Sequence, residues 1–413
     1  MSNISKLIEE LCPDGVAHLS MGETGSFRRG SGIQKKDFLE DGFPAIHYGQ
    51  IFTRYGLWAE ETFVFVSEGV AQKSRFAEFG DVIIATTSEN DEDLAKAVAW
   101  LGESQVAVSS DAMIYSPENL LAKFVSYFLN STDFQIQKEK YITGTKVRRI
   151  SSQNFEKIKI PVPPLVIQEE IVRILDRFTL LEAELEAELE VRKKQYAIFR
   201  QNLFITLNNF EERSLEGLGR WSGGSTPSKS NKSFWFDGKI PWVTAKDMQH
   251  SVLSDSQMHI SESALSATSI KIKPSNAIAI VVRSSILDKK LPVAYVPFES
   301  TYNQDMKVLE VASDLNPKYI FYALCADSDE ILRKCSKRGG SVASIIVPKM
   351  MSFCIPVPSQ AEQQRIVDIL DRFDALVNDI SSGLPAEIAA RRKQYEYYRD
   401  QLLTFKELQP AGS

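Results

Sequence analysis

Apolar residues recur every three or four positions along two long stretches of the chain, with polar residues between them. In the first stretch they are Ile171, Ile174, Phe178, Leu181, Leu185, Leu189, Tyr196, Phe199 and Leu203. In the second they are Ile366, Ile369, Phe373, Leu376, Ile380, Ile388, Tyr395, Tyr398 and Leu402. This spacing predicts two long amphipathic helices, the second interrupted at Ser381–Pro385. Because an apolar stripe is unstable in water, we expect them to pair as an antiparallel coiled coil.

The segments before the two helices show another pattern, in which short apolar runs alternate with Gly, Pro and Asp. Strands are predicted at Phe43–Ile46, Thr62–Val66, Gly80–Thr86 and Val106–Val108, and a short helix at Leu120–Asn130. Matching signals later in the chain are Ile240–Val243, Ala277–Val282 and Pro317–Leu324. The fold class expected is therefore α+β, with one mixed α/β scaffold built twice and different loops on each copy.

The two halves also repeat individual motifs. Ile160–Pro163 followed by Gln168–Phe178 returns as Ile355–Pro358 followed by Gln363–Phe373, and Arg192–Tyr196 returns as Arg391–Tyr395. A duplicated chain can fold with approximate two-fold symmetry inside one polypeptide. The expected boundaries are 1–160 for the first domain, 161–210 for the first helix, 211–355 for the second domain and 356–408 for the second helix.

Composition narrows the class of protein. The chain has 413 residues, 43% of them apolar, which suits a protein of several domains. No apolar run approaches the roughly 20 residues of a membrane span, so we expect a cytoplasmic protein without a membrane partner. The 4 cysteines show neither a C-x-x-C pair nor a cluster with histidine, so free thiols and no metal site are expected.

A net charge of −6 argues against nucleic acid as a partner, but the basic residues are clustered locally. Arg, Asn and Gln are also the side chains that read base edges in the major groove. Any one of these residues is by default a solvated surface residue, whereas the groups together predict DNA contacts. The candidates are Arg28, Arg29, Lys35, Tyr48, Arg54, Lys73, Arg75, Lys146, Arg148 and Arg149 in the first domain, and Lys229, Lys232, Trp235, Lys246, Arg283, Asn303, Gln304, Lys337 and Arg338 in the second.

The sequence contains no recognisable catalytic motif. An adenine methyltransferase needs Asn-Pro-Pro before an aromatic residue, whereas Pro163-Pro164 is followed by Leu165. A phosphate-binding loop is missing, and Gly30-Ser-Gly32 lacks the third glycine of a dinucleotide site. The histidines are expected to be ordinary packing or loop residues. The acidic residues Glu182, Glu184, Glu186, Glu188 and Glu190 leave two alternatives open, a solvated helix face or a docking surface for a basic partner.

In their order and duplication, these features resemble the specificity subunits of type I restriction-modification systems. The likeness covers nearly the whole chain: each domain opens near a Gly-rich turn such as Trp221–Pro227, closes with Ile-Pro-Val-Pro and is followed by a repeated helix. The resemblance implies two target-recognition domains, each reading one half of a bipartite site in double-stranded DNA. It also implies that the chain is non-catalytic and that the helices fix the gap between the half-sites.

The resemblance further implies the partners. Two methyltransferase (modification) subunits would dock on the helices, and restriction (nuclease and translocase) subunits would join through the complex. S-adenosylmethionine, Mg²⁺ and ATP would belong to those subunits, with no cofactor in this chain. Leu181–Glu184, repeated as Leu185–Glu188, resembles the four-residue repeats that set the gap in this family. The alternative is a coiled-coil adaptor with protein-binding globular domains, whose binding would respond far less to salt.

Overall fold

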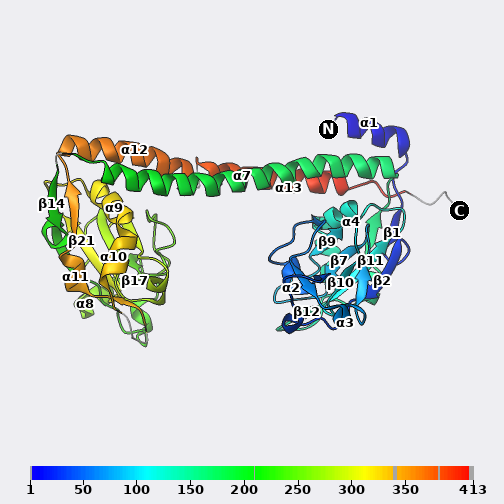
Figure 1. The fold of residues 1–413 in the computed structure, drawn as a ribbon, viewed down its shortest axis with the longest axis horizontal. Helices are drawn as coiled ribbons and strands as arrows, with labels where there is room; N and C mark the ends of the chain where they lie inside the picture. Colours follow the sequence, from blue (N-terminus) through cyan, green and yellow to red (C-terminus); the bar gives the residue numbers. More distant parts are fainter. Residues whose placement is uncertain (1, 209, 338–341, 380–381, 409–413) are drawn as a thin grey trace. The chain divides into compact units, whose positions relative to one another are not determined.

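The structure is a computed structural model that describes residues 2–208, 210–337, 342–379 and 382–408. It consists of two compact units, unit 1 (Met1–Glu186 and Ile388–Ser413) and unit 2 (Ala187–Glu387). Each unit contains one α/β domain and helical segments from both long stretches (Figure 1).

Unit 1 is built on two sheets. The five-stranded sheet has the order β2 (Gly25–Arg29), β11 (Ala112–Pro117), β7 (Val82–Ala85), β9 (Ala97–Trp100) and β4 (Trp58–Ala59). The four-stranded sheet has the order β5 (Val64–Val66), β3 (Phe43–Ile46), β10 (Val106–Val108) and β6 (Arg75–Ala77). Two-stranded sheets join β1 (His18–Ser20) to β13 (Lys159–Pro161) and β8 (Thr87–Ser88) to β12 (Arg148–Arg149). Its shorter helices are α1 (Ser2–Leu11), η1 (Lys35–Asp37), α2 (Tyr48–Ile51), α3 (Glu68–Ala71), α4 (Ala122–Phe128), α5 (Thr132–Glu139) and α6 (Ser152–Phe155).

Unit 2 repeats this plan with fewer strands. Its larger sheet has the order β15 (Gly219–Gly223), β21 (Met306–Val311), β18 (Ala277–Val281) and β19 (Val293–Val296). The smaller one has the order β17 (His259–Ile260), β16 (Ile240–Val243) and β20 (Thr301–Tyr302). Two-stranded sheets join β14 (Glu211–Ser214) to β24 (Cys354–Val357) and β22 (Ser336–Lys337) to β23 (Ser344–Ile345). Its shorter helices are η2 (Leu215–Leu218), η3 (Lys232–Phe234), α8 (Glu262–Ala267), η4 (Ser285–Asp288), α9 (Pro317–Ala326), α10 (Ser328–Cys335) and α11 (Val347–Met351).

The predicted fold class is confirmed, because both domains are mixed α/β structures built on a larger sheet, a smaller sheet and two two-stranded sheets. Both domains contain a parallel strand pair at the equivalent place, β3 with β10 in unit 1 and β16 with β20 in unit 2, and unit 1 has a second parallel pair, β4 with β9. The apolar runs are buried as their pattern requires, since every residue of β7 and of β18 is fully covered.

The long helices form antiparallel pairs within each unit. They are α7 (Leu165–Ile205), α12 (Gln360–Asn378) and α13 (Leu384–Leu403), so the predicted break in the second stretch falls after Asn378. In unit 1, α7 contacts α13: the ring centroids of Phe178 and Tyr398 are 5.4 Å apart, and Arg392 pairs with Glu182 and Glu186. In unit 2, α7 contacts α12, with Phe199 and Phe373 4.9 Å apart.

The repeated Gln-to-Phe motif fastens each long helix to its own domain. Fully buried Gln168 accepts a hydrogen bond from the Leu121 amide (2.8 Å) and donates to the carbonyls of Asn119 (3.0 Å) and Pro163 (2.8 Å). Gln363 bonds the Asn316 amide and the Pro358 carbonyl in the same way, both at 2.9 Å.

The aspartate of the motif adds a second fastening. Asp176 accepts from Lys123 and Tyr127, both at 2.8 Å. Asp371 accepts from the equivalent Lys318 (2.6 Å) and Tyr322 (2.7 Å). The motif therefore repeats because each unit uses it to hold the first turns of a long helix on the domain that precedes it.

All four cysteines are free, as expected. Cys354 on β24 is exposed, whereas Cys325 on α9 is buried, and burial raises the pKa of the Cys325 thiol to about 11. Cys12 in unit 1 is partly covered, and burial raises the pKa of its thiol as well. Among the described helices, none combines the length and the hydropathy that a membrane span requires.

Candidate nucleic-acid interface

Several candidates in unit 1 gather around the short polar connection between β10 and β11, Ser109–Asp111. Arg29 donates its Nε to the Ser110 carbonyl (3.1 Å), and the Tyr48 amide donates to the Ser109 hydroxyl (2.8 Å). The amide of Arg75 donates to the hydroxyl of Ser31, a residue paired with Ser109 across a bridge. Arg29 and Arg75 keep exposed side chains. We call this connection the polar loop of unit 1.

Lys35 belongs to the same neighbourhood through His47. His47 caps α2 by accepting from the Gly49 amide (3.2 Å). Burial, followed by the nearby Lys35 ammonium, holds the pKa of His47 below its ordinary value. His47 is therefore a structural residue, as expected. The effect of Lys35 on its pKa places the Lys35 ammonium near His47 and hence near the polar loop.

Unit 2 has the equivalent polar loop, Asn303–Asp305, between β20 and β21. The Asn303 amide donates to the Val243 carbonyl at 3.1 Å, just as the Ser109 amide donates to Ile46 at 3.1 Å. Gln304 is exposed and its side chain bonds the Thr226 hydroxyl. Sequence reasoning selected Asn303 and Gln304 in unit 2 but missed Ser109, Ser110 and Asp111. The sequence did contain a signal for these residues. Both triplets are short polar segments between two apolar strands, at matching positions in the two halves of the chain.

The Gly-rich turns noted in the sequence pack against these loops. A Cβ on Gly30 would overlap the carbonyl oxygen of Ser109, and one on Gly224 would overlap that of Asn303. Only glycine allows the backbone to approach so closely. The turns are therefore part of the loop architecture rather than a nucleotide site.

The first basic cluster lies on a small hairpin beside the polar loop of unit 1. Thr143 and Arg149 exchange backbone hydrogen bonds of 3.0 and 2.9 Å, and β12 pairs with β8. Arg148 is held by Asp91, with a Nε–Oδ1 distance of 2.9 Å, whereas Lys146 and Arg149 are exposed. The hairpin thus presents two of its three cations to solvent.

A buried lysine that sequence reasoning missed supports this hairpin. Lys138 is 1% exposed, and its Nζ donates to the carbonyls of Asp91 and Leu94, both at 2.8 Å. Burial lowers the pKa of Lys138 to about 8. It fixes the loop that carries Asp91, and Asp91 in turn holds Arg148. The sequence offered no sign of this, since lysine in a short polar helix usually faces water.

The second basic cluster lies on the equivalent hairpin of unit 2, with its charges on the other arm. Exposed Lys337 belongs to β22, which pairs with β23, and exposed Arg283 forms a bridge with Ser344 of β23. In unit 1 the charged arm is β12, the counterpart of β23. Arg338 lies outside the described residues.

The remaining candidates are more dispersed. Arg28 pairs with Asp81 at 2.9 Å and bonds Ser116 at 3.0 Å, which gives it an intrachain role. Arg54 lies over the Phe63 ring, 5.5 Å from its centroid. Trp235 packs against Trp242, 4.9 Å between centroids. The other four candidates are exposed lysines whose side chains form no described hydrogen bond or ion pair with either polar loop: Lys73, Lys229, Lys232 and Lys246.

The acidic residues of α7 are largely used within the chain. Besides the pairs of Glu182 and Glu186 with Arg392, Glu188 pairs with Arg192 (3.3 Å) and Glu190 with Lys193 (2.8 Å). These ion pairs are compatible with both alternatives, a solvated helix face and a docking surface for a basic partner. Carboxylates that are paired within the chain can still be exposed to solvent.

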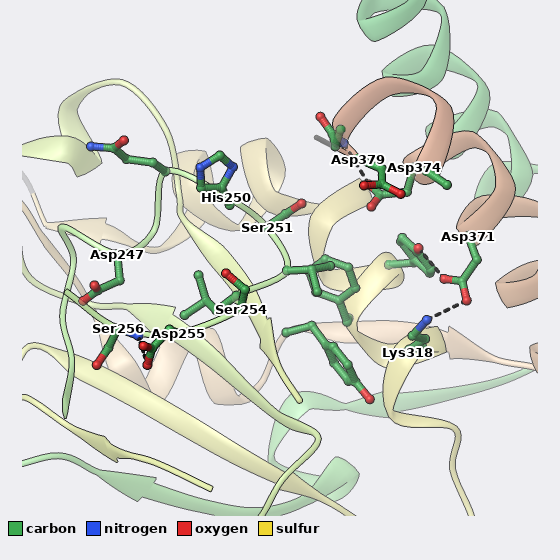
Figure 2. Close-up of a pocket in the computed structure, with 18 of the residues that line it drawn as sticks. Asp247, His250, Ser251, Ser254, Asp255, Ser256, Lys318, Asp371, Asp374 and Asp379 are labelled. Atoms are coloured by element: carbon green, nitrogen blue, oxygen red, sulfur yellow. Dashed lines mark hydrogen bonds and ion pairs between the residues drawn. The ribbon is translucent and has the colours of Figure 1, made fainter. Parts of the chain in front are cut away.

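Unit 2 also contains a cavity of about 780 Å³ between the segment 247–257 and helices α9 and α12 (Figure 2). The Lys318–Asp371 pair lines it, and burial raises the pKa of Asp374, another lining residue, with the Asp371 carboxylate as a smaller cause. At the matching place in unit 1, Trp58 lies over Lys123, 3.8 Å from the ring centroid, whereas unit 2 has exposed Val252. Within the described residues, no cluster of His, Cys, Asp and Glu has the make-up of a metal site.

Two related domains, each with exposed cations around an equivalent polar loop, define a duplicated recognition protein. The sequence pattern of the type I restriction modification DNA specificity domain matches residues 13–191 and again residues 208–390. The chain belongs to the family of type I restriction-modification DNA specificity subunits. It is such a subunit, with two target-recognition domains, and is itself non-catalytic.

Relatives extend over most of the chain. The type I restriction enzyme EcoR124I/EcoR124II specificity subunit of Escherichia coli is 46% identical over 323 residues, 76% of this chain and 79% of the relative. A putative type I specificity subunit of Haemophilus influenzae is 28% identical over 71% of this chain and 74% of its own length. A solved structure described as showing complex assembly and conformational transition of the type I system superposes with a TM-score of 0.63 at 16% identity. It covers 95% of this chain and 98% of its own and supports the fold.

Proposed function

We propose that residues 1–160 read one half of a bipartite DNA site and that residues 211–355 read the other. The observation that carries this proposal is the duplicated polar loop. Ser109–Asp111 and Asn303–Asp305 share their backbone bonds and their final aspartate but differ in the first two side chains, and each lies beside a hairpin with exposed cations. A common scaffold with different readers at the same place suits two half-sites of different sequence.

The long helices, with boundaries proposed at 161–210 and 356–408, would hold the two readers at a set spacing. They would also offer the surface on which two methyltransferase subunits dock, with restriction subunits joining through the complex. S-adenosylmethionine, Mg²⁺ and ATP would be bound by those subunits. A DNA-reading subunit works where the chromosome lies, so we place the complex in the cytoplasm.

Exchange of one domain tests the proposal. Replacing residues 1–160 with the corresponding domain of a relative of different specificity should change one half of the methylated site and leave the other half intact. Replacing residues 211–355 is the matched control and should change only the opposite half. Methylated adenines mapped across the genome of a host that carries the whole complex provide the measurement. A change in both halves after a single exchange would contradict one domain per half-site.

The proposed phosphate contacts have a separate test in the salt dependence of binding. Lys146→Ala combined with Arg149→Ala should weaken DNA binding and reduce the slope of log K against log salt by about two units, since each phosphate contact contributes roughly 0.9. Arg148 is left in place because Asp91 already holds it. Lys6→Ala with Lys406→Ala removes the same charge from exposed positions on α1 and after α13 and should leave the slope unchanged. An unchanged slope in the first variant would return Lys146 and Arg149 to ordinary surface charge.

A further inference from the structure

One aromatic side chain of unit 2 stands almost entirely in solvent. Phe236 is 81% exposed, more than any other large apolar side chain among the described residues. Its neighbours Phe234 and Trp235 point the opposite way and pack in a small core with Trp242. A single exposed apolar residue is common on protein surfaces, so the way the backbone presents this one decides its meaning.

The chain before Phe236 is tied down by hydrogen bonds. Asn231 caps η3 by accepting from the Ser233 amide at 3.2 Å. The Phe236 amide donates to the Lys232 carbonyl at 2.9 Å. The indole of Trp235 donates to the Ser228 carbonyl at 3.1 Å. This bond holds the Trp235 side chain on the side of the backbone opposite to Phe236.

The chain after Phe236 is equally constrained. Asp237 adopts a left-handed conformation with φ of 49°, which few residues other than Asn, Asp and Gly tolerate. Gly238 then passes so close to His259 that a Cβ would overlap the backbone of that strand. Because the loop is fixed on both sides, the ring of Phe236 is held out from the surface by a rigid support.

Three lysines and one acidic residue, Asp237, stand within seven residues of Phe236 in the sequence. Lys229, Lys232 and Lys239 are all exposed, and none of them forms an ion pair within the described residues. A protein-binding patch would extend the apolar surface around the ring. A single ring flanked by lysines instead suits DNA. The phosphates of DNA attract the lysines, and its stacked bases offer an apolar environment for the ring.

Unit 1 has a counterpart at the same point of the repeat. Lys35 begins η1 as Lys232 begins η3, and Phe38 packs inward against His47, 5.4 Å between centroids. The next residue, Leu39, is 47% exposed. Leu39 precedes β3 by the same interval at which Phe236 precedes β16. Both domains therefore project an apolar side chain from a lysine-bearing turn, and only unit 2 carries a ring.

We propose that Phe236 is an apolar wedge that inserts at a base step of the half-site read by unit 2. This inference rests on the proposed function and adds a recognition residue to it. Insertion of an apolar side chain unstacks a step and bends the duplex, and its cost depends on the step, being smallest at flexible pyrimidine–purine steps. Phe236 would thus select sequence through deformability without a hydrogen bond to a base.

The test uses the complete complex with its methyltransferase subunits and duplexes that carry the mapped site. Phe236→Ala should lower affinity about tenfold or more, because aromatic contacts with bases contribute at that level. The slope of log K against log salt should stay at the wild-type value, since no charge is removed. Phe236→Trp should restore most of the affinity. Adenines of the half-site replaced in turn by 2-aminopurine should reveal one step whose fluorescence changes with wild type and Trp but not with Ala.

The controls separate the wedge from other effects. Phe79→Ala removes a ring that is 70% exposed in unit 1 and should leave affinity and fluorescence unchanged. Lys232→Ala should lower the salt slope, in contrast to Phe236→Ala. Wild-type affinity and fluorescence in Phe236→Ala would overturn the wedge while leaving the half-site model intact. Failure of the wild-type complex to select a bipartite site would instead overturn the proposed function.

Discussion

Deleting Leu185–Glu188 should yield a complex that no longer methylates its original site and methylates instead a site whose unread spacer is one base pair shorter. Four helical residues add ~6 Å of rise and about 40° beyond one full turn. One base pair adds ~3.4 Å and about 34°. The rotations nearly agree, and bending of the DNA can absorb the remaining difference of about 2 to 3 Å.

The structure explains why such a deletion should leave the helix pair intact. Glu186 contacts Arg392, and after the deletion Glu190 occupies its place in the sequence. In the intact chain Arg192 pairs with Glu188, four residues before it. After the deletion Glu184 stands four residues before Arg192 and can form the same pair. The period of four therefore keeps a glutamate available for both arginines although α7 becomes shorter.

Genome-wide mapping of methylated adenines measures the spacer. Inserting one further Leu-Glu-Ala-Glu unit should lengthen it by one base pair, and replacing Leu185–Glu188 by four other helix-forming residues should leave it as it was. In every variant both half-sites should keep their sequences. An unchanged spacer in a folded, active deletion variant would show that the repeat is only a helix and not a ruler.

Gln168→Ala should destabilise unit 1 by about 3 kcal/mol and leave unit 2 nearly unaffected. The substitution removes three hydrogen bonds at a fully buried position and leaves the backbone groups of Asn119, Leu121 and Pro163 unpaired. Each buried group without a partner costs about 1–3 kcal/mol. Since Gln168 joins α7 to the first domain, recognition of the first half-site should weaken as well.

Hydrogen exchange locates the effect. The Leu121 amide should exchange faster in Gln168→Ala, and the Asn316 amide, which Gln363 accepts from, should respond only to Gln363→Ala. Exposed Glu169→Ala is the matched control on the same helix turn. Equal loosening of both amides by either substitution would contradict separate fastenings in the two units.

The periodicity of the sequence was sufficient to predict the elements that bury apolar residues. The stripe from Ile171 to Leu203 predicted α7, and Gly383 with Pro385 predicted the interruption between α12 and α13. Strands such as β7 and β18 followed from continuous apolar runs. These elements are predictable because burial of apolar side chains dominates their free energy and leaves a regular trace in the sequence.

The polar contacts were less accessible. The sequence showed that Gln168 and Asp176 recur as Gln363 and Asp371, but not which distant backbone groups they bond. Arg28 and Arg148 looked like DNA contacts, and their partners Asp81 and Asp91 lie far from them in the chain. Ion pairs depend on three-dimensional proximity and leave no periodic trace in the sequence, so a set of cations chosen from sequence includes residues, such as Arg28 and Arg148, that pair within the chain.

The distribution of thiols gives the protein its own attachment points for fluorescent dyes. Cys354 is exposed in unit 2, and Cys12, in unit 1, has a thiol pKa raised by burial. Because the thiolate is the reactive form, a maleimide dye at neutral pH should modify Cys354 first, and a second dye at higher pH should follow at Cys12. Buried Cys325 should remain unmodified. Energy transfer between the two dyes would then measure whether DNA binding changes the distance between the two units, with no engineered cysteine.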